Sequence, residues 1–160
     1  MFSVLKVYRL TVLVLAKFGL SKVTWATCGA VAICTLWRAK FIAAAITVHK
    51  EPGPGLLESA YEAFLAHELL TRGFTIERQK PLPVRYRGEV LDLGYRIDLL
   101  VENSVIVEVK SVERFHPIHG AQLVSYLRHS RCKVGLVLNF NVKWFVEDGI
   151  MRRVNGFPDE

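Results

Sequence analysis

The pattern of apolar and turn-forming residues predicts an α/β domain with a mixed α+β sheet, in the order helix, helix, three strands, helix, strand. Two segments, 38–50 and 56–72, have the composition and apolar spacing of helices, whereas the next three read as strands. A third helix beginning at Pro117 then separates these strands from a buried one at 133–140. Strands that alternate with helices in this way indicate one sheet covered by helices.

The helix boundaries follow from residues that stop or cap a helix. The run Pro52-Gly53-Pro54-Gly55 ends the first helix, because two prolines and two glycines cannot continue it. Gly73 is placed to cap the second helix, and the third is expected to run from Pro117 to about His129. The expected inward stripe of the second helix is Leu57, Tyr61, Phe64, Leu65 and Leu69.

Three strands are expected at 74–86, 89–101 and 105–111, with Arg87-Gly88 as the turn between the first two. The segment 144–156 is expected to form a short closing element. Apolar residues that should share one side of the second and third strands are Tyr95, Ile97, Leu99, Val101, Val105, Val107 and Val109.

The second and third strands each carry a carboxylate and are joined by the polar turn Glu102-Asn103-Ser104. An antiparallel hairpin centred on Asn103 puts Asp98 opposite Glu108 and Arg96 opposite Lys110, with Lys110 on the face of the two acids. Directly opposed Cβ atoms lie about 4.5–5.5 Å apart, close enough for two carboxylates to share one divalent cation. The alternative is a solvated strand face on which Lys110 pairs with Glu108.

Length and charge limit the function classes. The chain has 160 residues and a formal net charge of +6, enough for one domain, or one domain plus an extension. Residues 1–37 contain four basic residues and no acid, so only +2 remains for the domain expected at 38–160. The basic charge therefore does not by itself indicate a nucleic-acid-binding face. A local basic cluster remains at Arg78, Lys80, Arg85 and Arg87.

The three cysteines, Cys28, Cys34 and Cys132, offer neither a disulfide framework nor a CxxC metal pattern. A reducing compartment is therefore expected, and the cytoplasm is the expected location.

Residues 1–37 are apolar and mildly basic, with an uncharged run of 15 residues from Val23 to Trp37. This run is short of the about 20 residues that a spanning helix needs. Three interpretations stay open: a membrane or interfacial helix, extra helices packed on the domain, or a segment without a settled role, such as translation from an upstream start.

Asp98 followed by Glu108-Val109-Lys110 resembles the Asp…(Asp/Glu)-x-Lys motif of the PD-(D/E)XK nuclease superfamily, whose core has the order αβββαβ. Ile97 stands where the superfamily's name has proline. Gln122 and Tyr126, one helical turn apart, resemble the Gln-x-x-x-Tyr motif of RecB-like members.

The resemblance extends to a narrower family and covers about residues 38–157. The run Gly55-Leu-Leu-Glu58-Ser-Ala-Tyr61 matches the motif that names the GxxExxY protein family, although Pro52 stands where leucine is expected. Residues 1–37 fall outside the pattern and would form an N-terminal extension to the restriction-endonuclease-like core.

The resemblance implies a metal-dependent nuclease acting on DNA or RNA. Asp98, Glu108 and the carbonyl of Val109 would hold Mg²⁺ or Mn²⁺, with Glu58 either an outer ligand or a helix-terminus stabiliser. Lys110 would orient the attacking water or stabilise the developing charge. Gln122 would contact water or phosphate, and Tyr126 is the weaker candidate for the site.

A second function remains open: an inactive module on the same fold that binds nucleic acid or a protein partner. The small net charge of the domain favours it, since non-specific binding depends on neutralising phosphates. A homodimer and a membrane-tethered form through residues 1–37 are further hypotheses.

Overall fold

The computed structural model describes residues 28–92 and 94–155 of the chain. The chain divides into two compact units, Met1–Ala43 and Ala44–Glu160. Helix α2 (Cys28–Lys50) begins ten residues before the predicted start at Arg38, and so crosses the boundary expected after residue 37. Residues 1–27 of the predicted extension lie outside the described residues. None of the described helices has the length and hydropathy needed to cross a membrane.

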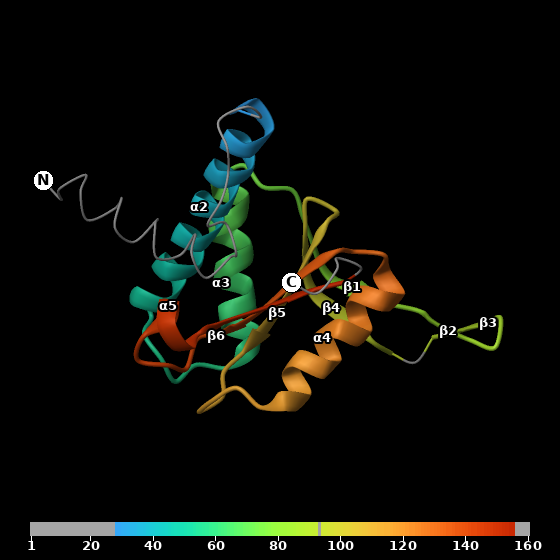
Figure 1. Ribbon diagram of the computed structural model, residues 1–160. Helices are drawn as coiled ribbons and strands as arrows, with labels where there is room; N and C mark the ends of the chain where they lie inside the picture. The colour runs from blue at the N-terminus through green and yellow to red at the C-terminus, as the bar shows by residue number, and fades with distance from the viewer. Residues whose placement is uncertain (1–27, 93, 156–160) are drawn as a thin grey trace, which may run out of the picture. The chain divides into compact units, whose positions relative to one another are not determined.

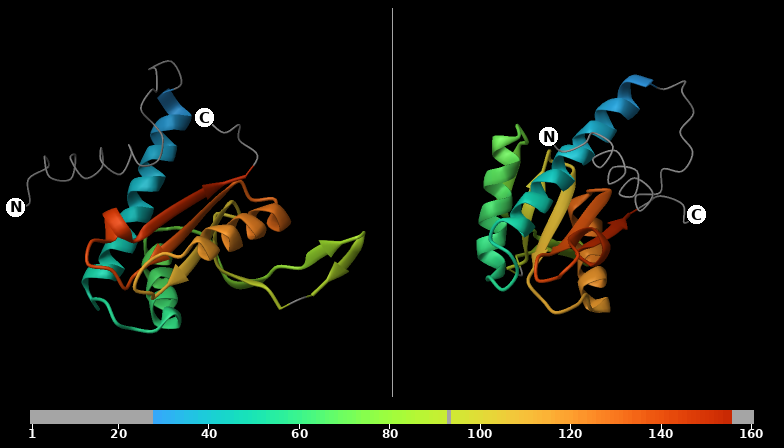
Figure 2. Two further views of the ribbon diagram at one scale, coloured as in Figure 1. Left: turned by 60° about the horizontal axis from the view of Figure 1, so that its bottom comes forward. Right: turned by 90° about the vertical axis from the view of Figure 1, so that its left-hand side faces the viewer.

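A five-stranded mixed sheet forms the centre of the second unit, with the strand order β1-β4-β5-β6-β7 (Figures 1 and 2). Only β5 and β6 are parallel, since the pairs β1–β4, β4–β5 and β6–β7 are antiparallel. The strands are β1 (Ile76–Pro81), β4 (Arg96–Val101), β5 (Val105–Lys110), β6 (Val134–Asn139) and β7 (Ile150–Val154). The predicted α/β class with a mixed sheet is confirmed.

Two helices cover the sheet from opposite sides (Figure 2). Helix α3 (Glu58–Thr71) contacts β1, β4 and β5, whereas α4 (Pro117–Ser130) contacts β5, β6 and β7. The cluster beneath α4 joins strand and helix residues, namely Leu82, Ile97, Leu100, Ile106, Leu123, Tyr126, Leu127, Cys132 and Val137. Because both faces are covered, the central strands are apolar almost throughout rather than alternating.

The buried face of α3 differs in part from the predicted stripe. Tyr61, Leu65 and Leu69 are fully buried, as predicted. Leu57 and Phe64 are 77% and 43% exposed, so their prediction as inward residues was wrong. The buried face instead includes Glu62 and Ala66. With about 3.6 residues per turn, these two residues lie on the side of the helix away from Leu57 and Phe64.

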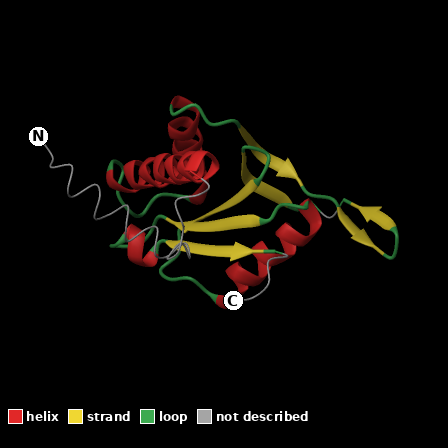
Figure 3. Cartoon of the chain, turned by 45° about the horizontal axis from the view of Figure 1, so that its top comes forward, coloured by secondary structure: helices red, strands yellow, loops and turns green. Residues whose placement is uncertain are grey.

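The strands predicted at 74–86 and 89–101 are each interrupted, which corrects the prediction of two long strands. Short strands β2 (Val84–Tyr86) and β3 (Glu89–Leu91) form a separate two-stranded sheet that extends away from the main one (Figure 3). Pro83, which lacks an N–H, stands at the interruption in the first strand, where a ladder bond cannot form. Arg87 and Gly88 form the predicted turn, both with positive φ.

Tyr95 also departs from prediction, because it precedes β4 and is 45% exposed rather than packed in the core. The predicted closing element at 144–156 consists of the short helix α5 (Phe145–Asp148) and β7, which pairs with β6 at the sheet edge. Helix α3 ends at Thr71, and Gly73 follows with φ +86°, as its predicted capping role requires.

Candidate active site

The candidate site lies where the ladder between β4 and β5 ends. The pairs Leu99–Val107, Leu100–Ile106 and Val101–Val105 confirm the predicted hairpin register. One residue beyond the last pair, the Asp98 carboxylate accepts a hydrogen bond from the Val109 N–H at 2.9 Å. The Asp98 carboxylate thus takes the place of a backbone carbonyl as the acceptor for Val109. This bond holds Asp98 next to the part of β5 that carries Glu108 and Lys110.

Glu108 is buried beside Asp98, with 4% of its surface exposed. Its Oε1 atom is buried and has no hydrogen-bond partner. Burial raises the pKa of Glu108 to about 8, and the negative charge of Asp98 adds to the rise. Burial also raises the pKa of Asp98, although the Val109 N–H and Lys110 act in the opposite direction. The two acids therefore form a desolvated, mutually repelling pair, and the positive charge of Lys110 offsets the rise in their pKa values only in part.

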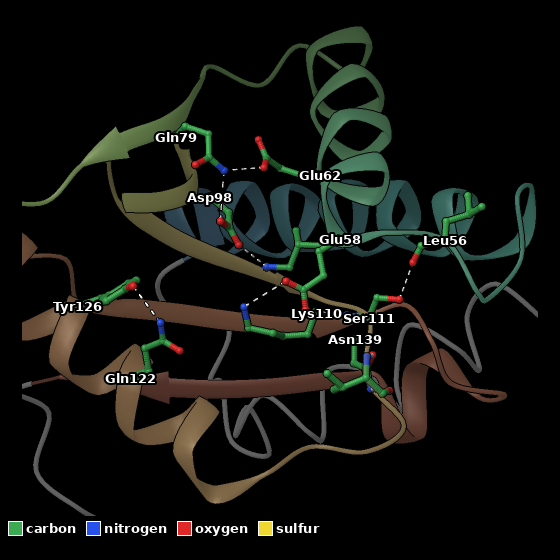
Figure 4. Close-up of polar contacts among 12 residues, drawn as sticks. Leu56, Glu58, Glu62, Gln79, Asp98, Lys110, Ser111, Gln122, Tyr126 and Asn139 are labelled. Atoms are coloured by element: carbon green, nitrogen blue, oxygen red, sulfur yellow. Dashed lines mark hydrogen bonds and ion pairs between the residues drawn. The ribbon is translucent and has the colours of Figure 1, made fainter. Parts of the chain in front are cut away.

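Lys110 extends from the same strand toward helix α3, where its Nζ atom lies 3.7 Å from Glu58 Oε2 (Figure 4). The other Glu58 oxygen accepts the N–H of Ser111 at 3.1 Å, and the Ser111 hydroxyl donates to the Leu56 carbonyl at 2.6 Å. Both Glu58 oxygens are thus engaged with the end of β5. The first turn of α3 is tied to the strand that carries Glu108 and Lys110.

Two site residues absent from the sequence prediction are Gln79 and Glu62. The Gln79 side-chain amide donates to Glu62 Oε2 at 2.6 Å and to Asp98 Oδ1 at 3.3 Å (Figure 4). Glu62 is 6% exposed and also accepts a bond from Arg78 Nε at 3.0 Å. Glu62 could have been found from the sequence, because it is a carboxylate one helical turn after Glu58, next to the apolar stripe of the predicted helix.

Helix α4 supplies Gln122 and Tyr126, which the structure brings to each other. The Gln122 amide donates to the Tyr126 hydroxyl at 2.9 Å. Tyr126 is buried, and its ring centroid lies 6.0 Å from that of Tyr95. Burial raises the pKa of Tyr126, and the charges of Glu108 and Asp98 contribute to the rise.

Asn139 is a further residue that the sequence prediction missed. It is fully buried at the end of β6, in register with Lys110. Its amide accepts from the Val112 N–H at 3.0 Å and donates to the Val112 carbonyl at 2.8 Å. Both backbone groups of Val112 are therefore held, which fixes the path of the chain directly after Lys110.

Asp98 and Glu108 form a small set of oxygen donors for a divalent cation. Among residues 28–92 and 94–155, no group of three or more His, Cys, Asp or Glu side chains is arranged to hold a metal. The pair of Asp98 and Glu108 nevertheless offers carboxylate oxygens, one of them buried and without a partner. Oxygen ligands suit Mg²⁺ and Mn²⁺, and magnesium commonly uses one or two protein carboxylates with waters. The acid pair fits such a cation.

A family model of the PD-(D/E)XK nuclease superfamily matches residues 36–154. The chain belongs to the PD-(D/E)XK nuclease superfamily. No curated protein matches it, and no solved structure does. PD-(D/E)XK nucleases generally use divalent metals such as Mg²⁺. The mixed five-stranded sheet with flanking helices agrees with this superfamily, while membership of the GxxExxY family stays a prediction.

Proposed function

We propose that this protein is a metal-dependent nuclease that hydrolyses phosphodiester bonds of DNA or RNA. The observation that carries the proposal is the pair of half-buried Asp98 and buried Glu108, whose Glu108 Oε1 atom lacks a hydrogen-bond partner. A buried carboxylate oxygen without a partner is costly, and a cation removes that cost together with the repulsion between the acids.

The proposed cation is Mg²⁺ or Mn²⁺, held by Asp98, Glu108 and the backbone carbonyl of Val109. When bound, it would supply a Lewis acid for the phosphoryl group and a means of acidifying water. Glu58 is a candidate fourth ligand. Its contacts with Ser111 and Lys110 favour instead a role in orienting Lys110.

Lys110 is proposed to stabilise negative charge on the phosphoryl group. Its Nζ atom lies 3.7 Å from Glu58 Oε2, and a positive charge held beside the site acids suits an electrostatic role. Gln122 is proposed to contact water or phosphate. Tyr126, whose hydroxyl accepts the Gln122 amide hydrogen, would orient that amide.

One observation favours the alternative of a binding module without turnover. The described residues contain no cluster of three or more His, Cys, Asp or Glu side chains suited to a metal. In that case the same surface would bind nucleic acid or a protein partner, with an affinity for nucleic acid that weakens steeply as salt rises.

The test is cleavage of DNA and RNA, single- and double-stranded, by the full chain with Mg²⁺, with Mn²⁺ and with EDTA. An Asp98→Ala, Glu108→Ala double variant is compared with a Glu51→Ala, Glu89→Ala control, which removes two acids from exposed positions. Cleavage that requires metal and is lost only in the first variant is expected. Salt-sensitive binding without cleavage by a folded protein would support the binding module instead.

A further inference from the structure

Gln79 has an unusual backbone for a strand residue. Strand β1 pairs regularly with β4 on either side of it, at Arg78–Leu99 and Lys80–Ile97. Gln79 lies between these pairs, in the position facing Asp98, and has a φ of 49°. This left-handed conformation costs a residue other than glycine on the order of 1–3 kcal/mol and persists only where its surroundings enforce it.

The side chain of Gln79 supplies a reason for that backbone. Its Nε2 atom donates to Glu62 Oε2 at 2.6 Å and to Asp98 Oδ1 at 3.3 Å, so the two amide hydrogens serve two carboxylates. Glutamate at this position would add a third negative charge, and asparagine would be one methylene shorter. Glutamine alone combines the reach with two donors and no charge.

Glu62 is the second carboxylate that the Gln79 amide contacts. It is buried in α3, and its two oxygens accept from different residues, Oε1 from Arg78 and Oε2 from Gln79. Because each oxygen has a donor, the Glu62 carboxylate is fixed. It can therefore act as an anchor for the Gln79 amide.

Asp98 is held in the same way. Its Oδ1 atom accepts from Gln79 and its Oδ2 atom accepts from the Val109 N–H at 2.9 Å. One donor on each oxygen sets the plane of the carboxylate, and each oxygen keeps further acceptor capacity for a ligand. Removing either donor frees that plane to rotate away from Glu108.

We propose that Gln79 is a positioning residue for the divalent cation of this site. It acts through Asp98, whose carboxylate it orients, and it is braced by Glu62 on α3. The inference rests on the proposed function, since it concerns the same cation. Partners of this kind, which orient a metal ligand without touching the metal, typically contribute about 10-fold to 100-fold to metal affinity.

The test is calorimetric titration of the full chain with Mn²⁺, combined with urea unfolding without metal. Gln79→Gly removes both hydrogen bonds but adopts the left-handed backbone without strain. We expect its Mn²⁺ affinity to fall about 10-fold to 100-fold. Its unfolding free energy should stay close to that of wild type, because relief of the backbone strain offsets the donor that Glu62 Oε2 loses. A purely structural role would lower the stability and leave the affinity of the folded protein unchanged.

Lys80→Ala is the matched control, because it removes an ion pair with Glu77 from the same strand without contacting Glu62 or Asp98. Its Mn²⁺ affinity should stay within error of wild type. Glu62→Gln should weaken binding in the same direction as Gln79→Gly, and the double variant should bind no more weakly than Gln79→Gly, because the two act in series.

The outcomes separate the inference from the function on which it rests. Wild-type affinity in Gln79→Gly, together with lost binding in Asp98→Ala, would overturn the role of Gln79 and leave the cation site in place. An equal loss of affinity in Lys80→Ala would also overturn it. Failure of the wild-type protein to bind Mn²⁺ at all would overturn both.

Discussion

The part of the β4–β5 pair near the turn and the part beyond the ladder differ in polarity and in hydrogen bonding. At the turn end, Leu99, Val101 and Val107 are fully buried and joined by a regular ladder. At the other end, Asp98 substitutes its side chain for a ladder acceptor and lies beside the buried Glu108. The β4–β5 pair thus contains buried apolar side chains that stabilise the fold. Directly beyond them lie the two site acids, whose repulsion destabilises the fold.

Stability and function therefore depend on adjacent segments of one hairpin, the apolar ladder near the turn and the carboxylates directly beyond it. Substitutions at the turn end should cost stability. Substitutions at the carboxylate end should relieve repulsion and cost metal binding. Residues held in unfavourable states persist at functional sites because the surrounding structure compensates for them. The contrast also separates the two kinds of substitution experimentally.

The largest effect on stability is expected at the turn end. Leu99→Ala removes a fully buried side chain from the centre of the sheet and should lower the free energy of unfolding by about 2–5 kcal/mol. Urea unfolding monitored by circular dichroism measures this. The matched control is Leu57→Ala, whose side chain is 77% exposed and whose loss should change stability by about 0.5 kcal/mol or less. Equal effects of the two variants would contradict the contrast.

The next effect concerns pH and the carboxylate end. The folded-state pKa of Glu108, raised by burial from 4.5 to about 8, means that its contribution to stability is fully present below pH 4.5 and is lost as pH rises through about 8. Without metal, the unfolding free energy should fall by at most about 5 kcal/mol over this range, since one pKa unit corresponds to about 1.4 kcal/mol.

Glu108→Gln should remove most of this pH dependence and be the more stable protein at the alkaline end of the range. Glu89→Gln, at an exposed position of β3, is the control and should keep the wild-type profile. Added Mg²⁺ should raise the unfolding free energy of the wild-type protein at high pH, but it should not raise that of Glu108→Gln. A wild-type profile that stays flat would mean that the acid pair is not strained in the folded protein.

The smallest effect is expected at Glu58, which joins the carboxylate end to α3. Its pair with Lys110 spans 3.7 Å and its side chain is 46% exposed, so Glu58→Gln should change stability by about 1 kcal/mol or less. Gln keeps an acceptor for Ser111 but loses the charge. We expect Mn²⁺ affinity close to wild type and a lower cleavage rate, because Lys110 loses its orienting partner.

Glu68→Gln is the matched control for Glu58, because it removes the ion pair with Arg72 on the same helix, away from the site. It should leave the cleavage rate unchanged. A loss of Mn²⁺ affinity in Glu58→Gln as large as in Asp98→Ala would instead make Glu58 a cation ligand.

Local sequence patterns were enough to predict the three main helical segments, the hairpin register and the positions of Asp98, Glu108 and Lys110 along the hairpin. These follow from local patterns, since a turn at Asn103 flanked by two apolar runs specifies which residues oppose each other. The prediction that Gln122 and Tyr126 lie together followed from their one-turn spacing on a helix, and they share a hydrogen bond.

The other polar residues of the site are brought together by contacts between distant segments. Gln79 and Glu62 are 17 residues apart, and Asn139 and Val112 are 27 apart, so their bonds depend on how α3, β1 and β6 meet. Packing also decided that Phe64 faces solvent and that the two long strands divide. Local patterns specify periodicity and turns, whereas contacts between distant segments depend on which faces pack together, and that choice is made by the fold as a whole.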